Sequence, residues 1–246
     1  MPNPQSSISH SRDHRPEFMA TLGLAPPYAI EDVHQAYREK AKQTHPDRGG
    51  SAAAFNAVHE AFQQAQAYLE FRTDRRKWIA ARMGRYVALE AAAARLSALG
   101  ASISTVMPRW LEQSFGDFAQ LTETPVLLRA IDVPNGDQII AALVSDSAAL
   151  RELEAIELTG ASVTDDAVLR LAVFQNLRRL NLARTPVTAR VLELIDAIPT
   201  LQSLALDGAN VGWWSRRRAA GKLRRRLAGD ETIAAPLHEL GEFKPT

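Results

Sequence analysis

Two stretches near the N-terminus carry apolar residues at helical spacing. They lie in 30–43 and 51–70, and the apolar positions are Val33, Ala36, Tyr37 and Ala41, then Phe55, Val58, Ala61, Phe62 and Ala65. Side chains three and four positions apart share one face of an α-helix. The pattern therefore predicts two helices that pack antiparallel as a hairpin, within an all-helical domain over 16–72.

In the second half of the chain the apolar positions follow a repeat. They recur at an offset of 24 residues as Leu153, Ile156 and Leu158, then Leu177, Leu180 and Leu182, then Leu201, Leu204 and Leu206. A weaker copy, Leu128, Ile131 and Val133, comes 25 residues before the first. This L-x-x-L-x-L pattern resembles a leucine-rich repeat. Each x-L-x-L segment predicts a short strand, and segments 165–173 and 189–198 predict the helices that close the coils.

These patterns predict a multidomain α and α/β protein. The expected segments are a disordered tail at 1–15, the helical domain at 16–72, a connecting helix at 73–100, a solenoid N-terminal cap at 101–123, leucine-rich repeats at 124–212, and a basic C-terminal cap and tail at 213–246. The tail has too few apolar residues to offset the entropy of ordering it. The cap at 101–123 contains an amphipathic stretch that can cover the first repeat.

The turn 45–50, His-Pro-Asp-Arg-Gly-Gly, joins the two predicted helices. Proline fixes its own φ and disfavours the α region for the residue before it, so the first helix must end at His45 and present His45 and Asp47 outward. The two glycines let the chain reverse, and Ser51 can cap the next helix. Beside the apolar face of the first helix, every fourth residue is basic or histidine: His34, Arg38 and Lys42.

Together these residues resemble a J domain, the module that stimulates ATP hydrolysis by Hsp70 chaperones. The matching positions between Glu17 and Phe71 are Phe18, Leu22 and Gly23, then Ala36, Tyr37 and Arg38, then His45, Pro46 and Asp47, then Phe55, Val58, Ala61 and Phe62. The resemblance implies that His45, Pro46 and Asp47, with His34, Arg38 and Lys42, bind Hsp70. An exposed carboxylate at a rigid bend can form a charge-assisted bond to an arginine, and basic side chains can steer an acidic partner.

Three positions depart from the J-domain pattern. Glu39 stands where a basic residue is common, Lys40 where a core leucine is usual, and Thr44 where an aromatic residue often precedes the turn. Lys40 can lay its stem on apolar surface, but it contributes less core than leucine. The first two departures leave open an interaction protein whose hairpin has lost its coupling to Hsp70.

If the resemblance holds, the protein is a co-chaperone whose repeats recruit a client or scaffold protein. The polar positions expected on the exposed strand face are Arg151, Glu157, Arg178, Arg179, Asn181, Gln202 and Ser203. Solenoids commonly bind their partners through such a face. The identity of the client is left open.

Basic residues gather after the last repeat. They are Arg216, Arg217, Arg218, Lys222, Arg224, Arg225 and Arg226, and they follow Trp213 and Trp214, which suit a cap over the last coil. Arginines can bind phosphates and indoles can stack on bases, so the alternative function is a nucleic-acid-associated adaptor. A solvated cap helix is the simpler interpretation.

The absence of cysteine, of long apolar stretches and of catalytic motifs limits the classes of protein to which the chain can belong. The chain has no cysteine, which excludes a disulfide framework and a thiolate zinc site and fits a reducing compartment. It has neither an apolar leader nor an apolar stretch of about 18 residues, so we expect a cytoplasmic protein without a membrane span. We expect no enzyme, cofactor or metal, because no catalytic motif occurs and the histidines are not grouped at ligand spacings.

Overall fold

The computed structural model describes residues 15–228, which form two compact units. The helical unit comprises the residues up to Arg82 together with Arg109–Ala119, and the repeat unit comprises Met83–Pro108 together with the residues from Gln120 onward. Many helices and one small five-stranded sheet agree with the expected α and α/β class. Of the expected tail 1–15, only Arg15 is described, and its guanidinium donates a hydrogen bond to the Leu24 carbonyl at 3.3 Å. Residues 229–246 of the expected C-terminal segment also lie outside the described part.

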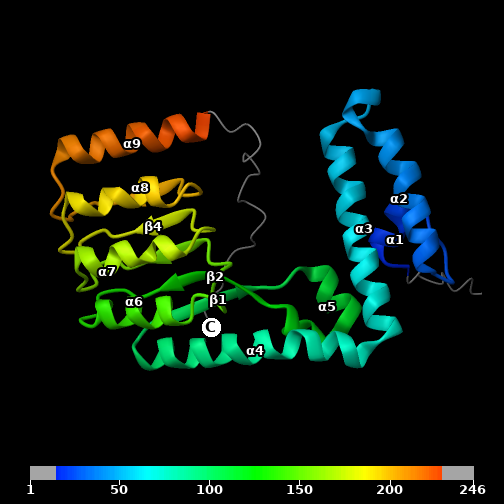
Figure 1. Cartoon of the computed structure of the whole chain (residues 1–246), viewed down its shortest axis with the longest axis horizontal. Coiled ribbons are helices and arrows are strands. Elements are labelled where there is room, and N and C mark those ends of the chain that lie inside the picture. Colours follow the sequence, from blue (N-terminus) through cyan, green and yellow to red (C-terminus); the bar gives the residue numbers. More distant parts are fainter. Residues whose placement is uncertain (1–14, 229–246) are drawn as a thin grey trace, which may run out of the picture. The chain divides into compact units, whose positions relative to one another are not determined.

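Helices α1 (Glu17–Leu22), α2 (Ile30–Thr44) and α3 (Ala52–Thr73) form the body of the helical unit, with a 3₁₀ turn at Pro46–Arg48 between α2 and α3. The helical hairpin expected over 30–43 and 51–70 is confirmed (Figure 1). Its buried core contains Phe18, Met19, Leu22, Val33, Val58, Ala61 and Ala65. Apolar burial at these helical positions is the main force that holds the three helices together.

Helix α4 (Arg75–Ala98) contributes residues to both units, so it is more than a connection. In the helical unit Trp78 is buried, and its ring centroid lies 5.0 Å from those of Phe71 and Phe115. Burial lowers the pKa of the Arg82 guanidinium, which lies over the Trp78 ring, while the Glu70 carboxylate opposes that shift. In the repeat unit the same helix supplies Leu89, Ala92 and Leu96 to the core.

The segment expected to cap the repeats, 101–123, divides between the two units. Only β1 (Ser102–Val106) joins the sheet. Helix α5 (Arg109–Phe115) and the following 3₁₀ turn (Gly116–Thr122) begin in the helical unit, where Trp110 packs edge-on against Phe18 and Phe115 against Phe71. An aromatic cluster therefore holds α5, a partner that amphipathicity alone does not identify.

The sheet of the repeat unit runs in sequence order from β1 to β5. Its other strands are β2 (Thr124–Arg129), β3 (Ala155–Glu157), β4 (Arg179–Asn181) and β5 (Ser203–Ala205). Strand β1 is antiparallel to β2, and β2 to β5 are parallel. Ile156, Leu180 and Leu204 pair across β3, β4 and β5, which confirms the 24-residue offset.

The predicted register of the weaker first copy is wrong. Leu128 pairs with Ile156 rather than with the position of Leu153, and Ile131 is 47% exposed. The cause is the segment 146–154 between α6 (Gly136–Ser145) and β3, which is longer than the corresponding segments 174–178 and 198–202 of the next two coils. The later coils close with α7 (Asp165–Leu169) and a 3₁₀ turn at Arg170–Val173, and with a 3₁₀ turn at Ala189–Glu193 and α8 (Leu194–Ala197).

Helix α9 (Trp213–Ala228) ends the described repeat unit, beyond α8 in the stack of helices (Figure 1). Ala219 and Leu223 join the buried core, as a cap requires. The tryptophans do not serve as that cap, because Trp213 is 54% and Trp214 76% exposed. No helix within 15–228 has both the length and the apolar character needed to cross a bilayer.

Candidate functional site

The turn after α2 holds Asp47 in the open. The Asp47 side chain is 87% exposed and that of His45 is 43% exposed. Helix α2 ends at Thr44, and His45 adopts the extended conformation that the following proline favours. The predicted outward position of both side chains is therefore confirmed.

Hydrogen bonds make this turn a defined structure. The backbone N–H groups of Arg48 and Gly50 both donate to the His45 carbonyl, at 2.9 and 3.1 Å. The Asp47 N–H donates to Nδ1 of His45 at 3.2 Å, so the neutral imidazole carries its proton on Nε2. The His45 ring also packs edge-on against Phe55 of α3, with centroids 5.4 Å apart. The His45 imidazole therefore stabilises the conformation of the turn and also forms part of its surface.

Gly50 is required by a close approach of the backbone. A Cβ atom at this position would lie 2.1 Å from the Thr44 carbonyl oxygen. Gly49 meets a different need, because its φ of +86° lies in the left-handed region and nothing stands within 4 Å of an added Cβ. Ser51 accepts a hydrogen bond from the Ala54 N–H at 3.1 Å and caps α3 as expected.

A hollow of about 320 Å³ adjoins the turn. Its apolar part is formed by Tyr37, Ala41 and Phe55, and its rim by Lys42, His45, Asp47 and Arg48. Arg48 is exposed and was not among the predicted binding residues. Its position directly after Asp47 could have indicated that it belongs to the same surface. The rim mixes one carboxylate with two cations, so it can accept a partner surface that carries both signs of charge.

The predicted basic face of α2 is present. His34, Arg38 and Lys42 are exposed, and within 15–228 the structure shows no ion pair of Arg38 or Lys42. The His34 ring packs edge-on against Phe62, with centroids 5.3 Å apart, which ties that imidazole to the hairpin. Arg38 and Lys42 therefore keep their charges available for a partner.

The three departures from the J-domain pattern take different positions. Lys40 is half-buried, and an added Cβ at Gly23 would lie 3.5 Å from its Cε, so its stem covers the end of α1 as expected. Glu39 accepts a hydrogen bond from Gln35 at 3.0 Å. The Thr44 hydroxyl donates to the Lys40 carbonyl at 2.9 Å. None of the three displaces the turn or the basic face.

The polar residues expected on the strand face are largely paired. Glu157 bonds Arg129 at 2.7 Å, Arg178 lies 3.9 Å from Glu154, and Asn181 accepts the Ala183 N–H at 3.0 Å. Arg151 precedes β3 rather than lying on it, and pairs with Glu152 at 3.1 Å. Arg179 and Ser203 are exposed on paired positions of β4 and β5. The face remains polar, with its charges mostly balanced.

The C-terminal basic residues do not form one set. Arg226 donates to three carbonyls of the last coil, and Lys222 pairs with Asp196. Arg216 is half-buried, and no described residue bonds its Nε. The remaining members, Arg217, Arg218, Arg224 and Arg225, are exposed.

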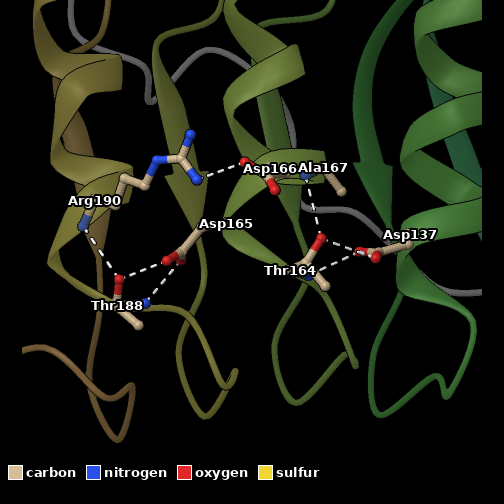
Figure 2. A network of polar contacts seen from close by, with 7 residues as sticks. All are labelled: Asp137, Thr164, Asp165, Asp166, Ala167, Thr188 and Arg190. Carbon is tan, nitrogen blue, oxygen red and sulfur yellow. Dashed lines mark hydrogen bonds and ion pairs between the residues drawn. The ribbon is translucent and has the colours of Figure 1, made fainter.

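A polar network that the sequence patterns did not reveal links the coils. Asp137 accepts the N–H and hydroxyl of Thr164, at 2.7 and 2.9 Å, and Asp165 accepts the same two groups of Thr188 in the next coil (Figure 2). Arg190 also pairs with Asp166. In the sequence, the only sign of this network was that threonine recurs at an offset of 24 residues, at Thr164 and Thr188. That recurrence does not identify the aspartates as the hydrogen-bond acceptors. These bonds join neighbouring coils through backbone N–H groups and side chains, which is a structural role.

Comparisons with protein-family models, curated proteins and solved structures gave no match to this chain.

Proposed function

We propose that the helical unit is a J domain that stimulates ATP hydrolysis by an Hsp70 chaperone. The observation that carries the proposal is Asp47, an almost fully exposed carboxylate on a hydrogen-bonded bend. A rigid, exposed acid loses little conformational entropy when it pairs with an arginine of the partner. Its placement within 45–47, directly after a helix with exposed Arg38 and Lys42, supports this function over a plain surface turn.

The repeat unit is proposed as a short leucine-rich repeat solenoid that recruits a client or scaffold protein. Two observations support this interpretation. Strands β3, β4 and β5 are parallel and in register, and a helical segment follows each of them (Figure 1). The balanced charges of the strand face favour a partner that replaces existing polar contacts over one attracted by a net field. In this model the helical unit supplies Hsp70 activation and the repeats supply specificity.

The test is Asp47→Asn in the full chain, assayed for stimulation of ATP hydrolysis by the Hsp70 of the same organism. The change keeps the side-chain shape but removes the charge, so we expect stimulation to fall at least tenfold, to near the basal rate. The matched control is Asp32→Asn, an exposed acid in the first turn of α2, the helix that precedes the turn, and this variant should stimulate normally. Unchanged stimulation by Asp47→Asn, with helicity intact, would refute the J-domain function.

A further inference from the structure

One face of α9 has an unusual composition. At 100° per residue, the side away from the buried Ala219 and Leu223 presents Trp213, Trp214, Arg217, Arg218, Arg224 and Arg225. All six side chains are exposed, and α9 contains no acidic residue. We call these six residues the Trp–Arg face. Arginine and tryptophan together favour a partner that carries both anionic groups and flat rings.

Two other basic residues of α9, Lys222 and Arg226, are bonded to the preceding coil. Arg226 donates to the carbonyls of Ile195, Ile198 and Leu201 at 2.6, 3.0 and 3.2 Å, so it closes the end of the last coil. Lys222 pairs with Asp196, which removes its charge from competition for a partner. The contacts of Arg226 and Lys222 give these two basic side chains a structural role in the cap. They do not account for the exposed arginines of the Trp–Arg face.

Three arginines of the face have no such explanation. Within 15–228 the structure gives Arg224 no ion pair or hydrogen bond, and Arg225 bonds only the Gly221 carbonyl of its own helix, at 3.3 Å. Arg217 has one contact, with the Trp213 ring, at 5.3 Å from its centroid. Arg218 differs, because it lines a hollow with Glu193 and Asp196, which offset its charge. Arg217, Arg224 and Arg225 therefore present uncompensated charge spread over about 12 Å of helix axis.

The indoles of Trp213 and Trp214 lie at the N-terminal end of the row of arginines. Their ring centroids are 4.5 Å apart at an interplanar angle of 75°, and Trp214 is the more exposed, at 76%. The ring of Trp213 supports its neighbour edge-on, which limits the freedom that Trp214 would lose on binding. An exposed, supported ring is a stacking platform that accepts any base.

We propose that the Trp–Arg face binds single-stranded nucleic acid, with phosphates on Arg217, Arg224 and Arg225 and a base stacked on Trp214. Guanidinium groups bind phosphate oxygens in pairs, and the helix holds the three guanidinium groups and the ring on one side. The binding would not select a sequence, because neither contact reads base edges. It is independent of the proposed Hsp70 activation, which uses other residues.

An acidic membrane is the less favoured partner. Interfacial helices insert an apolar face below the lipid headgroups. The apolar residues of the α9 interior, Ala219 and Leu223, are instead packed in the repeat core. The exposed large apolar side chains of α9 are Trp213 and Trp214 at its start and Leu227 near its end, and four exposed arginines lie between them in the sequence, so they form no continuous apolar face.

The direct test is fluorescence anisotropy of a labelled 20-nucleotide oligo(dT) titrated with the full chain at several salt concentrations. We expect binding that weakens steeply as salt rises. The double variant Arg224→Gln, Arg225→Gln should bind more weakly and lower the slope of log affinity against log salt by about 1.4, because each phosphate contact on a single strand contributes about 0.7. Trp214→Ala should weaken binding about tenfold with an unchanged slope, because stacking releases no counterions.

The matched control is Arg85→Gln, Arg170→Gln, which removes two exposed arginines of the repeat unit outside both proposed binding faces and should bind like the parent chain. Circular dichroism and the melting temperature of each variant must equal those of the parent chain, and its Hsp70 stimulation should be unchanged. No oligonucleotide binding by the parent chain at 50 mM salt would overturn the proposal, as would an equal loss in the control. Binding to phosphatidylserine vesicles but not to the oligonucleotide would also overturn it and assign the face to a membrane.

Discussion

Gly49 and Gly50 show that adjacent residues of one type can be required for different reasons. Gly49 has a left-handed φ of +86° with free space around it, whereas Gly50 leaves room for the Thr44 carbonyl. An alanine at 49 meets backbone strain of about 1–2 kcal/mol. An alanine at 50 must move the end of α2 or the start of α3, because the atom in its way belongs to the backbone. The sequence suggested only that both glycines help the chain to reverse.

This difference gives a prediction for two matched variants. Gly50→Ala should lower the free energy of unfolding of the helical unit by about 3 kcal/mol, the upper end of the usual range for overpacked sites, and Gly49→Ala by about 1–2 kcal/mol. Urea unfolding followed by tryptophan fluorescence measures both values. A larger loss for Gly49→Ala would show that the close approach at Gly50 relaxes at little cost.

For the candidate site, the sequence was sufficient to predict the features that depend only on residues close together in the chain. Proline determines the conformation of His45, and helical spacing groups Arg38 with Lys42, so the turn and the basic face followed from the chain alone. The bond from the Asp47 N–H to the His45 ring did not, because ring orientation depends on packing against Phe55 of another helix. Likewise, no pattern distinguishes the engaged Arg226 from the exposed Arg224 two positions earlier.

At the scale of elements, hydrophobic spacing predicted the strands better than their partners. The 24-residue period placed β3, β4 and β5 in register because their coils have equal length. It failed for β2, because the connection 146–154 after α6 makes the first coil four residues longer and shifts the pairing partner of Leu128 to Ile156. It also could not assign α5, because an amphipathic face shows that a helix is buried without showing against what.

The aspartate–threonine bonds of Figure 2 add a polar contribution between coils, and it is testable at one junction. Asp165→Ala leaves the Thr188 N–H and hydroxyl without their acceptor, so we expect a loss of about 1–2 kcal/mol in the free energy of unfolding of the repeat unit. Thermal unfolding followed by circular dichroism measures it. The adjacent Asp166→Ala removes only the exposed ion pair with Arg190 and should cost less than about 1 kcal/mol. Equal losses would mean that the charge near the start of α7, rather than the bonds to Thr188, provides the stabilisation.

At the scale of the whole chain, α4 raises the question of whether the two units unfold together. It gives Trp78 to the core of the helical unit and Leu89, Ala92 and Leu96 to that of the repeat unit. A separate apolar core in each part favours two transitions, since most of the buried side chains of each cluster contact their own unit. The chain contains a suitable probe, because Trp78 is buried and Trp110 half-buried in the helical unit, whereas Trp213 and Trp214 are already exposed. Tryptophan fluorescence therefore reports mainly on the helical unit, and circular dichroism reports on both.

Two matched substitutions separate the units. Leu22→Ala and Leu180→Ala each truncate a leucine that is at most 2% exposed, one in each core, and each should cost about 2–5 kcal/mol locally. Leu22→Ala should move the fluorescence transition to lower urea concentration and weaken Hsp70 stimulation. Leu180→Ala should leave that transition and the stimulation in place while it lowers a second transition seen by circular dichroism. If both substitutions instead moved the fluorescence transition equally, α4 would couple the two cores into one cooperative unit, and loss of stability in the repeats would also impair the turn that carries Asp47.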